Sequence, residues 1–128
     1  MGSKRIMVID DEPEVVNLIE VFLQLDNFEV HKFYDARSAL VVLRRDPTFD
    51  LILLDIMMPG MDGWELYKTI KKENPLKTIP VAIITAKSKE EDRRWAIEEQ
   101  GVDDYIVKPF GMSDFMDRVH RLVKAPTH

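Results

Sequence analysis

The sequence predicts an α/β domain in which helices cover both faces of a parallel β-sheet. Two observations carry this prediction: five short apolar runs recur along the 128 residues, and segments with helical spacing of apolar residues separate them. Strands that alternate with helices favour right-handed crossovers and parallel pairing. Because domains usually hold about 100–200 residues, we expect a single domain over 1–128, with its core at about 4–124 and a tail at 125–128.

The apolar runs are the expected strands. They are Ile6–Ile9, Phe28–Phe33, Leu51–Leu54, Val81–Ile84 and Tyr105–Val107. Three of them are continuous and rich in Val, Ile and Leu, which is typical of strands buried on both faces. The second run alternates instead and interleaves Glu29, His31 and Lys32. Such charges suit an edge strand, because they discourage pairing with other chains.

Five helices are expected between and after these strands. Pro13 opens the first helix, Asp35 is the expected N-cap of the second, and the third lies between Gly63 and Asn74. The fourth, at about 89–100, carries few apolar residues, so we expect it to be weakly anchored. The fifth has a clear apolar stripe of Met112, Phe115, Met116, Val119, Leu122 and Val123.

The composition excludes several classes of function. The 18 Lys and Arg against 23 Asp and Glu give a net charge of −5, and direct nucleic-acid binding is not expected without a basic face. The absence of cysteine excludes disulfides, thiolate zinc sites and cysteine nucleophiles. No apolar run approaches the roughly 20 residues of a membrane span, and no signal peptide is apparent. We therefore expect a cytoplasmic protein without membrane insertion.

Polar residues follow four of the expected strands. In a parallel sheet the carboxyl ends of the strands share one edge, and ligands bind there where the strand order reverses. The residues are Asp10, Asp11 and Glu12 after the first strand, Asp55 after the third, Thr85 after the fourth, and Lys108 and Pro109 after the fifth. Of these we expect the carboxylates of Asp10, Asp11 and Asp55, the Thr85 hydroxyl and the Lys108 ammonium to gather at this edge.

This set of side chains favours phosphoryl chemistry. Asp10, Asp11 and Asp55 would repel one another unless a hard cation lay between them, and Mg²⁺ suits such a site, with Mn²⁺ as the alternative. Asp55 is the expected nucleophile, because it follows a central strand and a carboxylate can form an aspartyl phosphate. Lys108 and the Thr85 hydroxyl would bind the phosphoryl oxygens. Each residue alone also has an ordinary explanation as a cap, a turn residue or a solvated lysine.

At these residues the sequence resembles the receiver domains of two-component response regulators, the CheY-like superfamily. The matching stretches are Ile9–Glu12, Leu54–Gly63, Thr85–Ala86 and Asp103–Phe110. The resemblance covers about 4–124 and implies a flavodoxin-like (βα)5 fold with strand order 2-1-3-4-5. It also implies that Asp55 takes a phosphoryl group from a histidine kinase or a histidine phosphotransfer domain.

The resemblance implies a metal site as well. Asp11 corresponds to a direct Mg²⁺ ligand, and Asp10 to a residue that acts largely through water. Asp55 and the backbone carbonyl of Met57 complete the implied ligand set.

Further roles follow from the resemblance. Lys108 would pair with the phosphoryl group and precede a cis bond to Pro109. Thr85 and Tyr105 would form a switch in which the hydroxyl moves to the phosphate and the ring turns inward. The output would pass through the fourth helix, the fifth strand and the fifth helix to a downstream protein or effector domain.

Two residues depart from small polar side chains at the rim of the implied site. Met57 stands two positions after Asp55, and Lys87 two positions after Thr85. In the family these positions flank the path of the hydrolytic water. We therefore expect Met57 and Lys87 to modulate dephosphorylation and to slow it.

Other functions are less well supported. A phosphatase of the haloacid dehalogenase type needs a second aspartate where Met57 stands. Dinucleotide-binding and flavodoxin-type proteins need a phosphate loop after the first strand, and acidic residues occupy that place. A degenerate receiver that only binds partners, independently of phosphorylation, is the remaining alternative. It is disfavoured because Asp55, Thr85 and Lys108 are all present.

The route of output leaves two alternatives, a stand-alone receiver and a fragment of a larger regulator. Asp104 and Arg118 weakly resemble the charge pair that receivers of transcription factors use across a dimer. An exposed pair contributes little free energy. We expect, at most, a homodimer that depends on phosphorylation.

Overall fold

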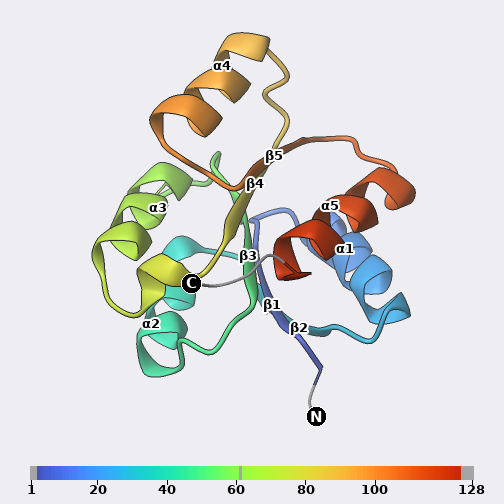
Figure 1. Cartoon of the computed structure of the whole chain (residues 1–128), viewed down its shortest axis with the longest axis horizontal. Helices are drawn as coiled ribbons and strands as arrows, with labels where there is room; N and C mark the ends of the chain where they lie inside the picture. Colours follow the sequence, from blue (N-terminus) through green and yellow to red (C-terminus); the bar gives the residue numbers. More distant parts are fainter. Residues whose placement is uncertain (1–2, 61, 125–128) are drawn as a thin grey trace.

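The computed structural model describes residues 3–60 and 62–124, so the predicted tail at 125–128 lies outside the described residues. Figure 1 shows a central sheet with helices on both sides. The strands are β1 (Arg5–Ile9), β2 (Glu29–Phe33), β3 (Leu51–Asp55), β4 (Val81–Thr85) and β5 (Asp104–Val107). The helices are α1 (Pro13–Leu25), α2 (Ala36–Arg45), α3 (Gly63–Lys72), α4 (Glu90–Arg94) and α5 (Met112–Lys124), with short turns η1 (Leu76–Thr78) and η2 (Trp95–Glu99).

All the strand pairs are parallel, and the strand order is β2-β1-β3-β4-β5. The predicted α/β class and the implied order 2-1-3-4-5 are therefore confirmed. The alternating strand, β2, lies at an edge of the sheet, and the continuous apolar runs form β1, β3 and β4 inside it. The carboxyl ends of β1 and β3 lie side by side, with Ile9 opposite Leu54.

Two hydrophobic cores hold the layers together, one on each face of the sheet. Residues of β1 alternate between them: Ile6 and Val8 pack with α1 and α5, whereas Met7 and Ile9 pack with α2 and α3. This alternation explains why the interior strands are apolar at every position, since each side chain meets a helix layer. No helix in the described ranges combines the length and the apolar character that a bilayer crossing requires.

The fourth helical segment differs from a regular helix. Its second half, η2, has π-helical geometry, and the Gln100 N–H donates to the Trp95 carbonyl at 3.1 Å, five residues back. None of the α4 side chains is buried; in η2, Ala96 is buried and Trp95 packs edge-on against Trp64 of α3, with ring centroids 5.0 Å apart. The predicted weak anchoring is confirmed, but the π geometry was not anticipated, because nothing in the residue spacing distinguishes a wide turn.

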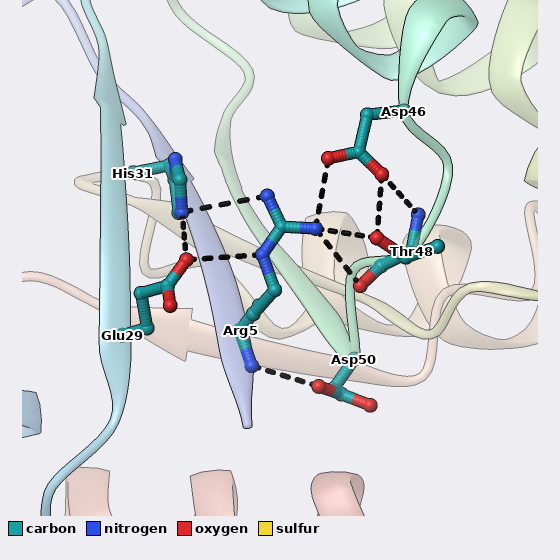
Figure 2. A network of polar contacts seen from close by, with 6 residues as sticks. All are labelled: Arg5, Glu29, His31, Asp46, Thr48 and Asp50. Atoms are coloured by element: carbon teal, nitrogen blue, oxygen red, sulfur yellow. Dashed lines mark hydrogen bonds and ion pairs between the residues drawn. The ribbon is translucent and has the colours of Figure 1, made fainter. Parts of the chain in front are cut away.

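At the amino ends of the strands, Arg5 ties β1 to its neighbours (Figure 2). Its Nε lies 3.0 Å from Glu29 Oε2 on β2, and its Nη1 lies 2.9 Å from Asp46 Oδ2 after α2. The guanidinium carbon lies 4.3 Å from the centroid of the Phe49 ring, and the backbone N–H donates to Asp50 at 2.7 Å. Because the strands are parallel, this network stabilises the amino ends of the strands, and the polar residues that follow the strands lie at the other end of the sheet.

Candidate functional site

The candidate site lies at the carboxyl ends of four strands. Asp10 follows β1, Asp55 ends β3, Thr85 ends β4 and Lys108 follows β5. The reversal of strand order falls between β1 and β3, so Asp10 and Asp55 leave adjacent strands at the position where ligands bind in open α/β sheets.

Three carboxylates form a tight cluster. One carboxylate oxygen each of Asp10, Asp11 and Asp55 lies within 4.8 Å of the others. Asp10 is 2% exposed and Asp55 3% exposed. Backbone N–H groups orient the two buried carboxylates: Glu12 donates to Asp10 Oδ1 at 3.0 Å, and Met57 donates to Asp55 Oδ1 at 2.9 Å. Each of these carboxylates therefore keeps one oxygen fixed by the chain.

The cluster fits a hard divalent cation. Asp10 Oδ2 is fully buried and accepts no well-directed hydrogen bond from the described residues, although the Lys108 ammonium lies 2.7 Å from it as an ion pair. A buried oxygen without a hydrogen bond loses free energy unless another group compensates it. Clustered carboxylate oxygens are the donor set that Mg²⁺ and Mn²⁺ prefer.

Lys108 is the cation within the cluster itself. Its Nζ lies 2.7 Å from Asp10 Oδ2, 2.9 Å from Glu12 Oε1 and 3.4 Å from Asp55 Oδ2. Burial by itself lowers the pKa of Lys108, but the Asp10 and Glu12 carboxylates outweigh it, and the net pKa is raised. The ammonium is therefore charged at neutral pH. The Lys108–Pro109 peptide bond is cis.

Burial raises the pKa of Asp55 from its ordinary value of 3.8 to about 6. The hydrogen bond from the Met57 N–H and the charge of Lys108 act in the opposite direction, and the charge of Asp10 adds to the rise. Desolvation of a carboxylate beside a second carboxylate disfavours its charged form. A bound cation would restore the charged form.

Thr85 and Tyr105 lie on the neighbouring strands and share a contact with the β4–α4 loop. The Thr85 side chain is fully buried, and its hydroxyl accepts a hydrogen bond from the Lys87 N–H at 3.2 Å. The Tyr105 ring is also buried, and its hydroxyl donates to the Lys87 carbonyl at 3.0 Å. Met57 and Lys87 themselves are exposed at the rim.

Sequence reasoning gave no site role to two residues that help to build this edge. The sequence places Glu12 directly after the first strand, but its contact with Lys108 spans 96 positions, so no local pattern predicts it. Gly63, at the start of α3, has no space for a side chain, because a Cβ there would lie 2.4 Å from the Asp55 carbonyl oxygen. The glycine therefore lets α3 begin directly against the backbone of Asp55 and Ile56.

A five-stranded parallel sheet in this order with an acidic carboxyl edge is the flavodoxin-like architecture of CheY-like proteins. Residues 6–120 match the family model described as the response regulator receiver domain, and the chain therefore belongs to this family of two-component signalling proteins. Receiver domains bind Mg²⁺ at an acidic pocket, and this chain has a cluster of three Asp residues at the carboxyl edge of its sheet.

The chain is similar to several named proteins. It is 38% identical over 117 residues to the regulatory protein VanRc of Enterococcus gallinarum, covering 91% of the chain and 48% of VanRc. It is 36% identical over 122 residues to the phosphate regulon transcriptional regulatory protein PhoB of Escherichia coli, covering 95% and 52%. The chain thus spans about half the length of these relatives.

Solved structures agree with this assignment. The response regulator TrrA of Thermotoga maritima, in complex with Mg²⁺ and BeF, superposes with a TM-score of 0.80 at 32% identity, covering 93% of this chain and 98% of that one. The receiver domain of the Francisella response regulator 1452 gives a TM-score of 0.85 at 30% identity, covering 95% and 98%.

The pKa of Asp55 predicts how pH changes the stability of the metal-free protein. Between about pH 3.8 and 6 the folded state keeps a proton that the unfolded chain has lost, so the free energy of unfolding falls as pH rises through this window. Asp55→Asn removes the titrating group. In EDTA the free energy of unfolding of the variant should exceed that of the parent by on the order of 1–3 kcal/mol at pH 7.5. At pH 4 the difference should be much smaller.

Urea unfolding between pH 4 and 8 measures this difference. Asp117→Asn, at an exposed position on α5, is the matched control and should follow the parent at every pH. A difference between Asp55→Asn and the parent that does not change with pH would contradict the prediction.

Proposed function

We propose that residues 4–124 act as a receiver domain that accepts a phosphoryl group on Asp55. The donor is the phosphohistidine of a histidine kinase or a histidine phosphotransfer domain, and the reaction depends on Mg²⁺. One observation supports this more than any other: the Asp55 carboxylate lies within an acidic cluster and 3.4 Å from the ammonium of Lys108. A nucleophile, a cation site and a fixed positive charge thus occupy one edge.

The proposed metal ligands are Asp11 directly, Asp10 largely through water, Asp55 and the backbone carbonyl of Met57. When bound, Mg²⁺ neutralises charge that develops on the transferring phosphoryl oxygens. The buried Asp10 Oδ2 accepts no hydrogen bond among the described residues and contacts the Lys108 ammonium as an ion pair, which supports a site for positive charge at this place. Mn²⁺ has similar preferences and would serve as well.

Asp55, Lys108 and Thr85 each have a separate role in the proposed phosphoryl transfer. An oxygen of Asp55 attacks the phosphorus, a P–O bond forms, and the P–N bond to the histidine breaks. Lys108 and the Thr85 hydroxyl bind the phosphoryl oxygens. Asp55 must be ionised to attack, and the charge of Lys108 lowers its pKa toward that state.

The donor protein would approach over an apolar pocket beside Lys108. This pocket is lined by Glu12, Val15, Leu18, Ala86, Lys108, Pro109 and Phe110. Apolar side chains next to the charged site could bury partner surface and exclude water from the transfer.

Phosphorylation would act on the surface formed by α4, β5 and α5. Thr85 and Tyr105 both contact Lys87, in the loop that leads into α4. A Thr85 hydroxyl drawn toward the phosphoryl group would give up its bond with the Lys87 N–H. Because none of the α4 side chains is buried, α4 can shift with this loop at little cost in packing free energy. The altered surface of α4, β5 and α5 would then bind a downstream protein or effector domain.

Intact mass after incubation with Mg²⁺ and phosphoramidate tests the phosphoacceptor. The parent should gain one phosphoryl group that is stable in acid and labile in base, and it should gain none in EDTA. Asp55→Asn should gain none, and Asp50→Asn, at the opposite edge of the sheet, should behave like the parent. A parent that remains unmodified would favour the alternative, a degenerate receiver that binds partners without phosphorylation.

Met57 and Lys87 are proposed to slow dephosphorylation. Met57 is 54% exposed beside the carboxylates, where its bulk would obstruct a water aligned with the phosphorus. Met57→Asn should release phosphate several-fold faster than the parent, which corresponds to a decrease on the order of 1 kcal/mol in activation free energy. The rate is measured as the decay of the phosphorylated mass after removal of the donor. Met112→Asn, at another exposed methionine, should decay like the parent. Equal decay of Met57→Asn and the parent would refute the proposal.

A phosphorylation-dependent homodimer through α4, β5 and α5 is also proposed. Within one chain Arg118 already pairs with Asp104 at 2.8 Å and with Asp114 at 2.9 Å, so a dimer would have to exchange these partners. Sedimentation velocity with Mg²⁺ and beryllofluoride should show a heavier species that Arg118→Ala weakens. A monomer in both conditions would count against the dimer.

A further inference from the structure

Glu12 occupies the N-cap position of α1 but does not cap that helix. Its side chain makes no capping hydrogen bond, although its carbonyl accepts from the N–H groups of Val15 and Val16 at 3.1 Å. The carboxylate instead points to the end of β5, where Oε1 lies 2.9 Å from Lys108 Nζ. An N-cap side chain usually satisfies a free N–H of its own helix. Here that local interaction is absent, and a contact across the site takes its place.

Lys108 shares its ammonium among three carboxylates. The group has three N–H donors and no acceptor, and its neighbours are Asp10, Glu12 and Asp55 at 2.7, 2.9 and 3.4 Å. The longest of these contacts is the one to Asp55, the proposed phosphoacceptor. To bind the oxygens of a phosphoryl group there, Lys108 must give up part of its contact with another carboxylate.

Glu12 is the carboxylate that can release Lys108 at least cost. The Asp10 side chain is 2% exposed and its other oxygen is held by the Glu12 N–H, so separating it from the ammonium would leave a buried charge. The Glu12 side chain is 60% exposed, and water can replace the ammonium there.

We propose that Glu12 is a positioning residue for Lys108, which it holds at the outer rim of the unphosphorylated site and releases when phosphoryl oxygens arrive. The Glu12 carboxylate and the phosphoryl group thus compete for the same ammonium. This inference rests on the proposed function, since it assigns Lys108 to the phosphoryl group. Removal of the competitor should favour the step in which Lys108 engages the phosphoryl group, and exposed ion pairs of this kind correspond to about a two- to fivefold change in rate.

Glu12→Gln tests the competition, with Glu14→Gln as its control. Both variants remove one negative charge from the same end of the chain's first helix, but Glu14 is exposed and forms no ion pair with the other described residues. With saturating Mg²⁺ and phosphoramidate, Glu12→Gln should phosphorylate about two- to fivefold faster than Glu14→Gln. Equal rates for the two variants would overturn the inference, because general charge would then explain any gain over the parent.

A second measurement uses metal-free protein and does not require phosphorylation. In EDTA, Glu12→Gln should lower the Tm of the parent, because an attractive contact is lost. In a Lys108→Met background the same change should raise the Tm, because it removes one of several carboxylates left without a cation. A Tm change of the same sign in both backgrounds would overturn the inference.

The two measurements separate the two proposals. If the parent takes up no phosphoryl group, the proposed function is refuted. If Glu12→Gln also changes the Tm in opposite directions in the parent and in Lys108→Met, the contact between Glu12 and Lys108 still stands. Normal uptake on Asp55 with equal rates for Glu12→Gln and Glu14→Gln would refute only the inference. Should Lys108→Met fail to fold, the comparison of rates decides alone.

Discussion

Mutual repulsion of carboxylates at the end of β1 and β3 is the constraint on which the site depends. The sheet order makes Asp10 and Asp55 neighbours, and burial prevents water from screening them. The chain offsets this repulsion with one ammonium, which Lys108 brings from the far side of β4. Among the described residues, one ammonium faces the carboxylates of Asp10, Asp11, Glu12 and Asp55, and this deficit of positive charge favours a divalent ion there.

The elements that surround the charged site differ in how firmly they are packed. β1, β3 and β4 are buried on both faces, so the strands that carry the carboxylates cannot easily move apart. The loop after Thr85 is different, since it leads into a helical segment with Ala96 as its buried residue. Under the proposed function, a phosphoryl group on Asp55 would therefore change the loop and the fourth helix before it changed the sheet. Firmly packed strands beside a weakly packed fourth helix suit the proposed function, in which phosphorylation of Asp55 alters the surface formed by α4, β5 and α5.

Much of the fold could be predicted from local patterns. The run Leu51–Leu54 predicts a strand buried on both faces, and β3 is one. Asp35 was expected to cap the second helix, and its carboxylate accepts from the Ser38 N–H at 2.7 Å. The convergence of Asp10, Asp55 and Lys108 also followed from their places after strands, because parallel strands end at a common edge. What could not be predicted were the features that depend on side-chain direction, such as the turn of Glu12 away from its own helix.

Local patterns in the sequence specify the succession of strands and helices and the polar residues that follow them, because these depend on periodicity and on neighbours in the chain. Packing of the elements against one another sets which carboxylates share the Lys108 ammonium, how closely α3 approaches Asp55 across Gly63, and how Arg5 joins β1 to its neighbours. These contacts join residues far apart in the chain. Their geometry arises only when packing fixes the direction of each side chain, and no local pattern of residues encodes that direction.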